Sequence, residues 1–319
     1  MSLNPERSAL SALAVLMLGG ILVACGGGGS DAGSTATVPS GSTGTSTAAA
    51  ACGVSFSVAN NSAKVNATSI SAWACSGTLR TMTGNGIPDH PVTDGNFATP
   101  ISAQSLSLTM ALAPALNGST VTDLPKMASG YVLNSVKLDP GTDGSCASMA
   151  TGTGNGAGCV AINGRDPWTL EAIGGAFQFG TDSSNAHVQP NGQYHYHGAP
   201  EGYLTRLGKG QAMTLVGFAV DGFPIYARWG YSSAGNAASA IKAMQPSWRK
   251  KAAPDAGRPS TSVFPMGTFT QDYEYAAGSG DLDECNGRTG VTPEFPGGIY
   301  HYFITDSYPY IQRCIKGSR

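Results

Sequence analysis

Two short segments of this chain concentrate histidine and tyrosine. The first reads PNGQYHYH over residues 190–197, the second reads PGGIYHYF over residues 296–303, and both fit the pattern P-x-G-x-Y-H-Y. They contain His195, His197 and His301, three of the five histidines in the chain. Imidazole is the commonest side-chain ligand of transition metals in proteins. The histidine runs therefore predict a metal site.

Each run follows a Pro/Gly turn and alternates tyrosine with histidine, which predicts a β-strand. Alternate side chains of a strand share a face, so His195 and His197 project together and His301 takes the place of His195 in the second run. If the two strands are neighbours, we expect these three imidazoles to meet. His187 is expected as a fourth ligand, because only a short turn separates it from the first run. Three nitrogens with one open or oxygen position suit copper or zinc.

Acidic residues offer two further roles. Asp283 or Glu284 could complete the metal site or orient an imidazole. In a metal-dependent hydrolase, Asp283, Glu284 or Asp221 would act as the general base. Residues 281–287 also have the composition of a calcium loop, but they lack its register, which favours an Asp/Asn-rich turn over a calcium site.

The histidines also have interpretations without a metal. They could be structural residues bonded to the backbone, or acid/base groups acting alone. The flanking tyrosines, which are Tyr194, Tyr196, Tyr300 and Tyr302, are expected to point to the opposite face and pack. His90 lies in a loop between prolines and is expected to have a surface or turn role and not to be a metal ligand.

The similarity of the two runs extends further along the chain. Residues 221–226 (DGFPIY) follow the first run and residues 306–311 (DSYPYI) follow the second, and both fit D-x-aromatic-P. Repetition of this kind predicts an internal duplication of one strand-turn-strand unit.

The N-terminal segment predicts export. Residues 8–24 are apolar, too short for a relaxed membrane span, and end in Leu22-Val23-Ala24-Cys25, which resembles the lipobox of bacterial lipoproteins. The resemblance implies a signal peptide over residues 1–24 and a lipid on Cys25 that anchors the protein in the cell envelope. Gly26, where inner-membrane retention would place Asp, indicates the outer membrane. An ordinary cleaved secretory signal is the alternative, and it also places the protein outside the cytoplasm.

Two parts follow the signal peptide. Residues 25–51 are rich in Gly, Ser, Thr and Ala and predict a flexible tether. Residues 52–319 show no second linker and are expected to form one domain. Its six cysteines form three well-separated neighbouring pairs, which predicts three disulfides in an oxidising compartment. These pairs are Cys52 with Cys75, Cys146 with Cys159, and Cys285 with Cys314.

The domain is expected to be mainly β, as a sandwich or barrel-like fold with long loops. Short alternating or apolar segments at residues 54–58, 106–110 and 215–220 predict strands. Two short helices are expected, one beginning at Asp166 and one over residues 236–244. Glycine and proline are frequent throughout, with 44 and 19 residues, which agrees with many turns.

Charge bears on the class of partner. The formal net charge is −2, and Arg249-Lys250-Lys251 is the one basic cluster, which disfavours nucleic-acid binding. Trp229 and Trp248 could instead contact carbohydrate or other envelope material. The sequence leaves the small-molecule or envelope ligand and the oligomeric state open.

A series of motifs runs in order from about residue 86 to residue 317. They are Gly86 to His90, Ala186 to Pro190, Tyr194 to Gly198, Asp221 to Tyr226, Gly280 to Arg288, Thr292 to Pro296, and Tyr300 to Tyr302. Together they resemble the YHYH domain family, named for the tetrapeptide at residues 194–197. One departure is Asn134-Ser135-Val136, where the family commonly has Gly in the middle. The resemblance implies an exported bacterial domain and carries no reaction with it, so the sequence favours a metal- or ligand-binding module.

Overall fold

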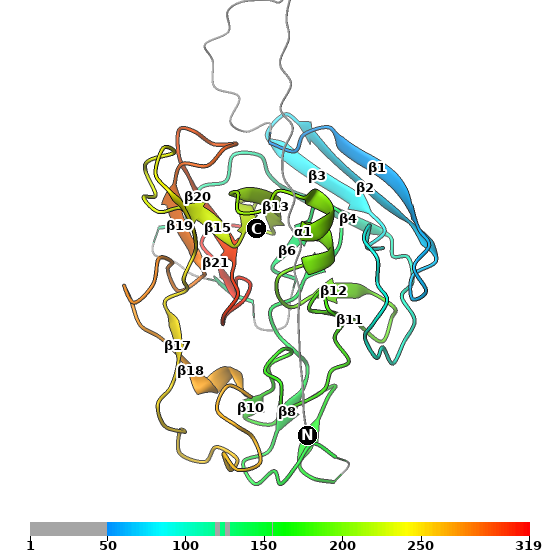
Figure 1. Ribbon diagram of the computed structural model, residues 1–319, viewed down its shortest axis with the longest axis vertical. Helices are drawn as coiled ribbons and strands as arrows, with labels where there is room; N and C mark the ends of the chain where they lie inside the picture. The colour runs from blue at the N-terminus through cyan, green and yellow to red at the C-terminus, as the bar shows by residue number, and fades with distance from the viewer. Residues whose placement is uncertain (1–49, 119–121, 125–127, 155) are drawn as a thin grey trace, which may run out of the picture. The chain divides into compact units, whose positions relative to one another are not determined.

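The computed structural model describes residues 50–118, 122–124, 128–154 and 156–319. The expected signal peptide, the lipidation site Cys25 and the expected tether up to residue 49 lie outside them. The described part is mainly β, as expected (Figure 1). None of its helices is both long enough and apolar enough to cross a bilayer.

The largest sheet has eight strands in the order β11-β12-β7-β6-β13-β14-β20-β19. Its central strands β13, β14 and β20 are almost continuously apolar, which is typical of strands buried on both faces. The strands are β6 (Gly130–Val132), β7 (Lys137–Leu138), β11 (Ala186–Val188), β12 (Tyr194–Tyr196), β13 (Thr214–Ala219), β14 (Pro224–Ala227), β19 (Gly287–Gly290) and β20 (Ile299–Ile304).

The large sheet consists of two halves with the same arrangement of strands, related across the centre of the sheet. Each half contains two antiparallel hairpins, β6-β7 and β11-β12 in one half and β13-β14 and β19-β20 in the other. In each half, the last strands of the two hairpins pair in parallel, β7 with β12 and β14 with β20. The halves meet where β6 pairs antiparallel with β13. We call β6, β7, β11 and β12 with their turns the first lobe, and β13, β14, β19 and β20 with theirs the second lobe.

The strand order supports the expected duplication but moves its boundaries. Residues 221–226 do not complete the first copy. They form the turn and the strand β14 that open the second lobe, about seventy residues before its histidine run in β20.

A four-stranded antiparallel sheet packs against the large sheet and gives a sandwich-like arrangement. Trp73 and Met82 of this sheet form one buried cluster with Phe218 of β13, and the Trp73 indole N–H donates to the carbonyl of Leu133 at 3.0 Å. No sheet of the described residues closes into a barrel. The strands are β1 (Val54–Asn60), β2 (Ala67–Ser76), β3 (Leu79–Gly84) and β4 (Leu106–Ala111).

Small sheets hold the long loops. One contains β8 (Ser145–Cys146), β9 (Cys159–Val160) and β10 (Trp168–Thr169). The two-stranded sheets pair β5 (Thr122–Asp123) with β21 (Cys314–Ile315), β15 (Trp229–Tyr231) with β16 (Ile241–Ala243), and β17 (Trp248–Lys250) with β18 (Tyr273–Tyr275). The three expected disulfides are all present, each closing a loop between neighbouring cysteines.

Both expected helix positions are wrong. At the first, Trp168 lies in strand β10 and packs against Phe269 beside the Cys146–Cys159 disulfide. At the second, Asn236 forms a turn and the chain continues as β16 in a hairpin. Tertiary pairing overrides local preference at both places. In the described part of the chain, the helices are α1 (Glu201–Leu207), which follows the first histidine run, and the short 3-10 helix η2 (Thr270–Asp272).

Candidate metal centre

Three imidazoles of the first lobe converge on one point. Nε2 of His197 lies 3.0 Å from Nε2 of His187 and 3.0 Å from Nε2 of His195. The candidate ligand atoms of these three residues all lie within 4.8 Å of one another. Three nitrogens at about 2.0–2.1 Å from a tetrahedral zinc ion would be separated by roughly 3.3 Å. The triad can therefore hold a transition metal with small adjustments.

The β11-β12 hairpin places these side chains. His187 and His195 are directly opposite each other in its register, and His197 follows two residues later on the same face. A second contact fixes the end of the run, because the backbone N–H of His197 donates to the carbonyl of Asn185 at 2.8 Å. Asn185 has a φ of 56°, and asparagine tolerates this left-handed conformation better than most residues.

Backbone carbonyls orient two of the rings. Nδ1 of His187 lies 2.9 Å from the carbonyl oxygen of Phe179, and Nδ1 of His195 lies 3.1 Å from that of Gln193. Because a carbonyl only accepts, both Nδ1 atoms carry the proton and both Nε2 atoms present lone pairs. Nδ1 of His197 is buried and has no hydrogen-bond partner among the described residues, so its tautomer is free to adjust.

Burial keeps the triad neutral. His195 and His197 are each 2% exposed, and His187 is partly buried. Desolvation lowers the pKa of His187 and holds the pKa values of His195 and His197 well below the usual range, with the neighbouring imidazoles and Lys137 acting in the same direction on His195. Neutral imidazole is the form that ligates a metal.

Lys137 and Asp139 place two charges beside the triad. Lys137 pairs with His195 in the sheet register, and its ammonium forms a buried ion pair with Asp139 at 2.8 Å. The Asp139 carboxylate also accepts from the amide of Gln189 at 3.3 Å and raises the pKa values of His187 and His197, against the dominant effect of burial. The sequence analysis missed these residues, since nothing local in the sequence connects β7 to the histidine run.

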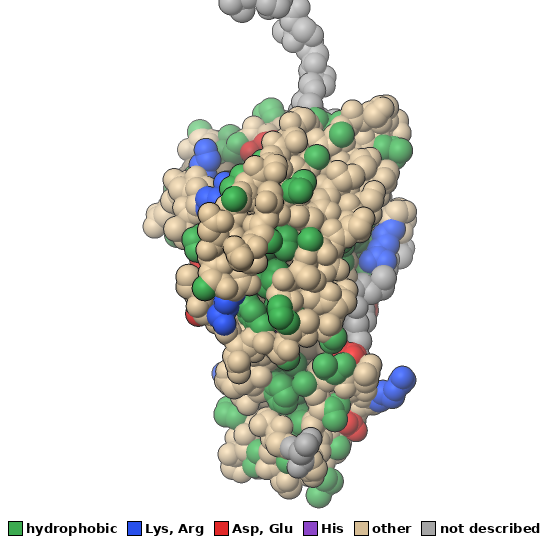
Figure 2. Space-filling view, turned by 90° about the vertical axis from the view of Figure 1, so that its right-hand side faces the viewer, with side chains coloured by type: hydrophobic (Ala, Val, Ile, Leu, Met, Phe, Trp, Pro, Cys, Tyr) green, Lys and Arg blue, Asp and Glu red, His purple; other side chains and the backbone are tan. Residues whose placement is uncertain are grey.

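The tyrosines of the run point away from the triad into the core, as expected. The Tyr194 hydroxyl donates to Asp182 at 2.5 Å, and that of Tyr196 lies 2.7 Å from Nε2 of His90. His90 lies in a bend of its loop, but the surface position considered for it is wrong, because its imidazole is buried next to Tyr196. Figure 2 shows no histidine on the side of the molecule that it presents.

Comparison with known proteins gives one family. The model described as "YHYH protein" matches residues 107–317, about two thirds of the chain, including all eight strands of the large sheet and both histidine runs. The chain belongs to the YHYH protein family. Searches of curated proteins and of solved structures gave no significant match. In this YHYH protein, the side chains of the tetrapeptide at residues 194–197 alternate between two faces of the strand. The tyrosines lie in the core and the histidines at the candidate metal centre.

The prediction that His301 joins the centre is wrong. Its strand β20 is separated from β12 by β7, β6, β13 and β14, so the two histidine runs are not neighbours. His301 packs against Tyr226 and Phe303, with ring centroids 5.4 and 5.1 Å away. His187, expected as a fourth ligand, belongs to the triad instead.

We expect His301 to make the YHYH domain sensitive to acid. Burial lowers its pKa from 6.5 to about 4, with Arg288 acting in the same direction. Because the folded pKa is the lower one, the stability contributed by the neutral imidazole is complete above pH 6.5 and is lost as the pH falls toward 4. This difference corresponds to about 3 kcal/mol. Chemical unfolding from pH 7 to 4 should therefore show a smaller loss for His301→Phe than for the unsubstituted protein, and parallel curves would contradict this.

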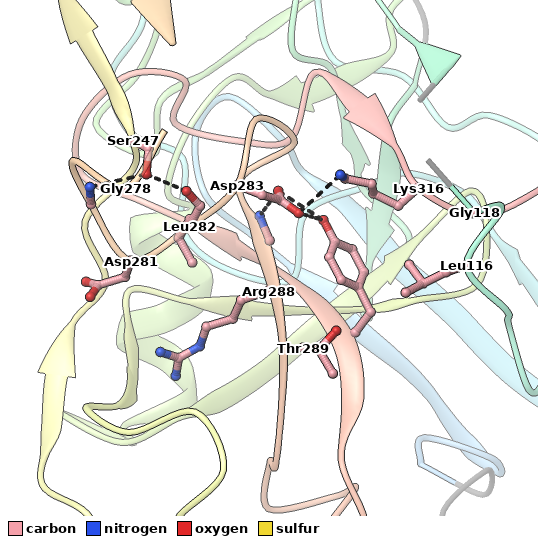
Figure 3. Close-up of a pocket in the computed structure, with 13 residues that line it drawn as sticks. Leu116, Gly118, Ser247, Gly278, Asp281, Leu282, Asp283, Arg288, Thr289 and Lys316 are labelled. Carbon is pink, nitrogen blue, oxygen red and sulfur yellow. Dashed lines mark hydrogen bonds and ion pairs between the residues drawn. The ribbon is translucent and has the colours of Figure 1, made fainter. Parts of the chain in front are cut away.

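The carboxylates considered as general bases lie in the second lobe. Asp283 accepts from the Tyr300 hydroxyl at 2.9 Å and lines a cavity of about 450 Å³ with Lys316 and Arg288 (Figure 3). Glu284 pairs with Lys316 at 2.5 Å. Among the described residues, the histidine triad is the group of metal-ligating side chains found, and it includes none of these carboxylates.

Asp221 also has a structural role. It is buried in the turn before β14, where it accepts from the Tyr302 hydroxyl at 2.6 Å and from the backbone N–H of Gly317 at 3.0 Å. Burial raises its pKa in spite of these bonds. It holds the C-terminal segment against the core.

The two tryptophans considered for carbohydrate contact lie in separate hairpins. Trp229 belongs to β15, whereas Trp248 of β17 packs between Tyr275 and Tyr308 and donates to the carbonyl of Glu284 at 2.9 Å. They do not form one aromatic row.

Proposed function

We propose that this protein is an exported, lipid-anchored member of the YHYH family whose triad, His187, His195 and His197, binds one copper or zinc ion. The protein would act as a metal-binding module of the cell envelope. The observation that carries the proposal is the convergence of three Nε2 atoms, two of which have lone pairs oriented by backbone carbonyls.

The chemistry of the donors favours these metals. Imidazole suits zinc and copper, whereas calcium and magnesium prefer oxygen ligands. Three ligands leave a fourth position for water or an envelope ligand, as in open zinc sites. The three disulfides agree with an oxidising compartment, and the lipobox-like segment supports an outer-membrane anchor at Cys25.

Elemental analysis tests the proposal directly. The protein purified without an affinity tag should contain close to one equivalent of copper or zinc, and the His195→Ala, His197→Ala variant should contain almost none. His301→Phe is the matched control, since it removes a buried histidine outside the triad. Equal metal content in the unsubstituted protein and the double variant would reject the proposal.

We expect Asp139 to support the ion electrostatically. Asp139→Asn would leave the Lys137 ammonium uncompensated beside a bound cation, so affinity should fall by about 10- to 100-fold, as for other residues that act around a metal site. Competition titrations with a chelating dye would measure the change. A smaller effect than that of Glu274→Gln, at an exposed ion pair with Arg249, would contradict this expectation.

A metal-dependent hydrolase is a second candidate function, and Asp139 is the observation that favours it. Its backbone N–H donates to the carbonyl of Tyr196, between His195 and His197, at 2.9 Å, and its carboxylate raises the pKa values of His187 and His197. A water on the ion would then have a base nearby. Turnover of an activated ester by the metal-loaded protein, lost in Asp139→Asn at saturating metal, would separate this enzyme from a binding module.

A further inference from the structure

The two lobes agree residue by residue at the turn between their first strands. The pairing of β6 with β13 places Tyr131 opposite Phe218. If these two residues are taken as equivalent positions of the two lobes, residues 130–139 align with residues 217–226. The aligned segments read GYVLNSVKLD and GFAVDGFPIY. Ser135 and Gly222 fall at the same position, and both have positive φ, at 64° and 90°.

The turns before the second hairpins repeat the same hydrogen bonds. In the first lobe, the N–H of Asp182 donates to Ala186 at 2.8 Å, and the N–H of Asn185 donates to Asp182 at 3.0 Å. In the second lobe, the N–H of Asp283 donates to the carbonyl of Gly287 at 2.8 Å, and the N–H of Asn286 donates to that of Asp283 at 3.0 Å. Asn185 and Asn286 both have left-handed backbones, with φ of 56° and 61°.

The histidine strands also correspond in detail. A tyrosine hydroxyl bonds to the aspartate of the turn in each lobe, from Tyr194 to Asp182 and from Tyr300 to Asp283. Nδ1 of His301 lies 2.9 Å from the carbonyl of Ile299, as Nδ1 of His195 does from that of Gln193 at 3.1 Å. The backbone frame of the metal centre is thus present twice.

This correspondence identifies what stands in place of the triad. His187 is opposite His195 in the first lobe, and Arg288 is opposite His301 in the second. His197 and Phe303 match through their N–H groups, which donate to the carbonyls of Asn185 and Asn286 at 2.8 and 2.9 Å. The triad of the second lobe is therefore Arg288, His301 and Phe303.

Arg288 brings a permanent positive charge to this position. Its guanidinium lies over Phe303, 5.4 Å from the ring centroid, and donates to the carbonyl of Tyr231 at 2.7 Å. It forms no ion pair with a carboxylate among the described residues. A guanidinium has no lone pair for a metal, and phenylalanine has no ligand atom. Nε2 of His301 is buried without a hydrogen-bond partner among the described residues, and because Nδ1 bonds a carbonyl, Nε2 presents a lone pair.

We infer that the second lobe is a latent copy of the metal centre, in which Arg288 takes the place of the ligand His187 and Phe303 that of the ligand His197. The chain then binds one transition-metal ion, and Arg288→His with Phe303→His restores a second site at His301. The inference rests on the proposed function of the first lobe.

Metal stoichiometry tests it. Zinc titration with equilibrium dialysis should give one equivalent for the unsubstituted protein and two for Arg288→His, Phe303→His. The reciprocal variant, His187→Arg with His197→Phe, should bind none and remain folded, because the second lobe already accommodates these side chains. Circular dichroism monitors folding in each case.

The number of zinc equivalents bound by each variant distinguishes failure of the proposed function from failure of the latent site. No zinc on the unsubstituted protein would reject the proposed function and with it the premise of the latent site, whereas one equivalent on the unsubstituted protein leaves the latent site to the second-lobe variant. No gain in a folded second-lobe variant would overturn the latent site. If that variant does not fold, the reciprocal variant decides: unfolding there as well would overturn the equivalence of the lobes, and a folded, zinc-free protein would support it.

Discussion

Replacing His187 by alanine is expected to lower metal affinity by more than about 100-fold, whereas replacing His301 by alanine should leave it unchanged. Substitution of a residue that only supports a ligand costs about 10- to 100-fold, so loss of a ligand should exceed that range. His187 lies 3.0 Å from the Nε2 atom of His197, and His301 lies four intervening strands away from the triad. Isothermal titration with zinc and with copper would measure both variants.

The pair of variants is informative because the histidines have similar surroundings. Both contact aromatic rings, and both use Nδ1 to bond a backbone carbonyl. Loss of a general packing contribution would therefore affect both variants, and loss of a ligand only one. Equal affinities of the His187→Ala and His301→Ala variants would show that the triad does not bind the ion.

Local sequence pattern predicted the strands and the disulfides well. The segments at residues 54–58 and 106–110 lie in β1 and β4, and the segment at residues 215–220 covers β13 up to its end at Ala219. Their alternating or apolar side chains meet a half-buried or buried sheet. The six cysteines pair with their neighbours, as expected when short loops close easily. The helices failed because their capping signals compete with strand pairing, which depends on distant residues.

The candidate site was predicted only in part, because it also depends on strand pairing between distant segments. The alternation of histidines fixes a shared face for His195 and His197, and a short turn brings back His187. Strand order has no local signal, so nothing in the two runs showed that four strands separate them. The similarity of the runs reflects equivalent places in two lobes and not adjacency. Lys137 was missed because its parallel pairing with His195 joins segments almost sixty residues apart.

The two lobes share the same backbone turns and tyrosine–aspartate hydrogen bonds, but they differ in the side chains at the ligand positions. Aspartate turns and tyrosine hydroxyls recur in both lobes and hold the hairpins, which explains why Asp283 is bound to a tyrosine and is not free to act as a base. The ligand positions differ between the lobes, where His187 and His197 correspond to Arg288 and Phe303. Under the proposed function, metal binding would thus depend on two side-chain positions of a backbone frame that occurs in both lobes.

The largest loss of stability is expected at the ion pair of Arg258 with Asp272, next to Phe269, which packs against Trp168 of β10. Their side chains are 0% and 1% exposed, and the guanidinium donates twice to the carboxylate, at 2.5 and 2.7 Å. Burial alone would raise the pKa of Asp272, but the bonds from Arg258 and from two backbone N–H groups lower it, so the carboxylate stays charged. Arg258→Met would leave that charge buried and uncompensated.

We expect Arg258→Met to lower the free energy of unfolding by about 3–5 kcal/mol, since one partner of a buried pair remains without its counter-charge. Arg249→Met is the matched control, because its pair with Glu274 at 2.9 Å is exposed, and such pairs contribute less than about 1 kcal/mol. Urea unfolding at pH 7 would measure both. Replacing Asp272 by leucine in the Arg258→Met background should recover part of the loss, because both charges are then gone. If Arg258→Met and Arg249→Met unfolded at the same urea concentration, the buried pair would not contribute as its geometry implies.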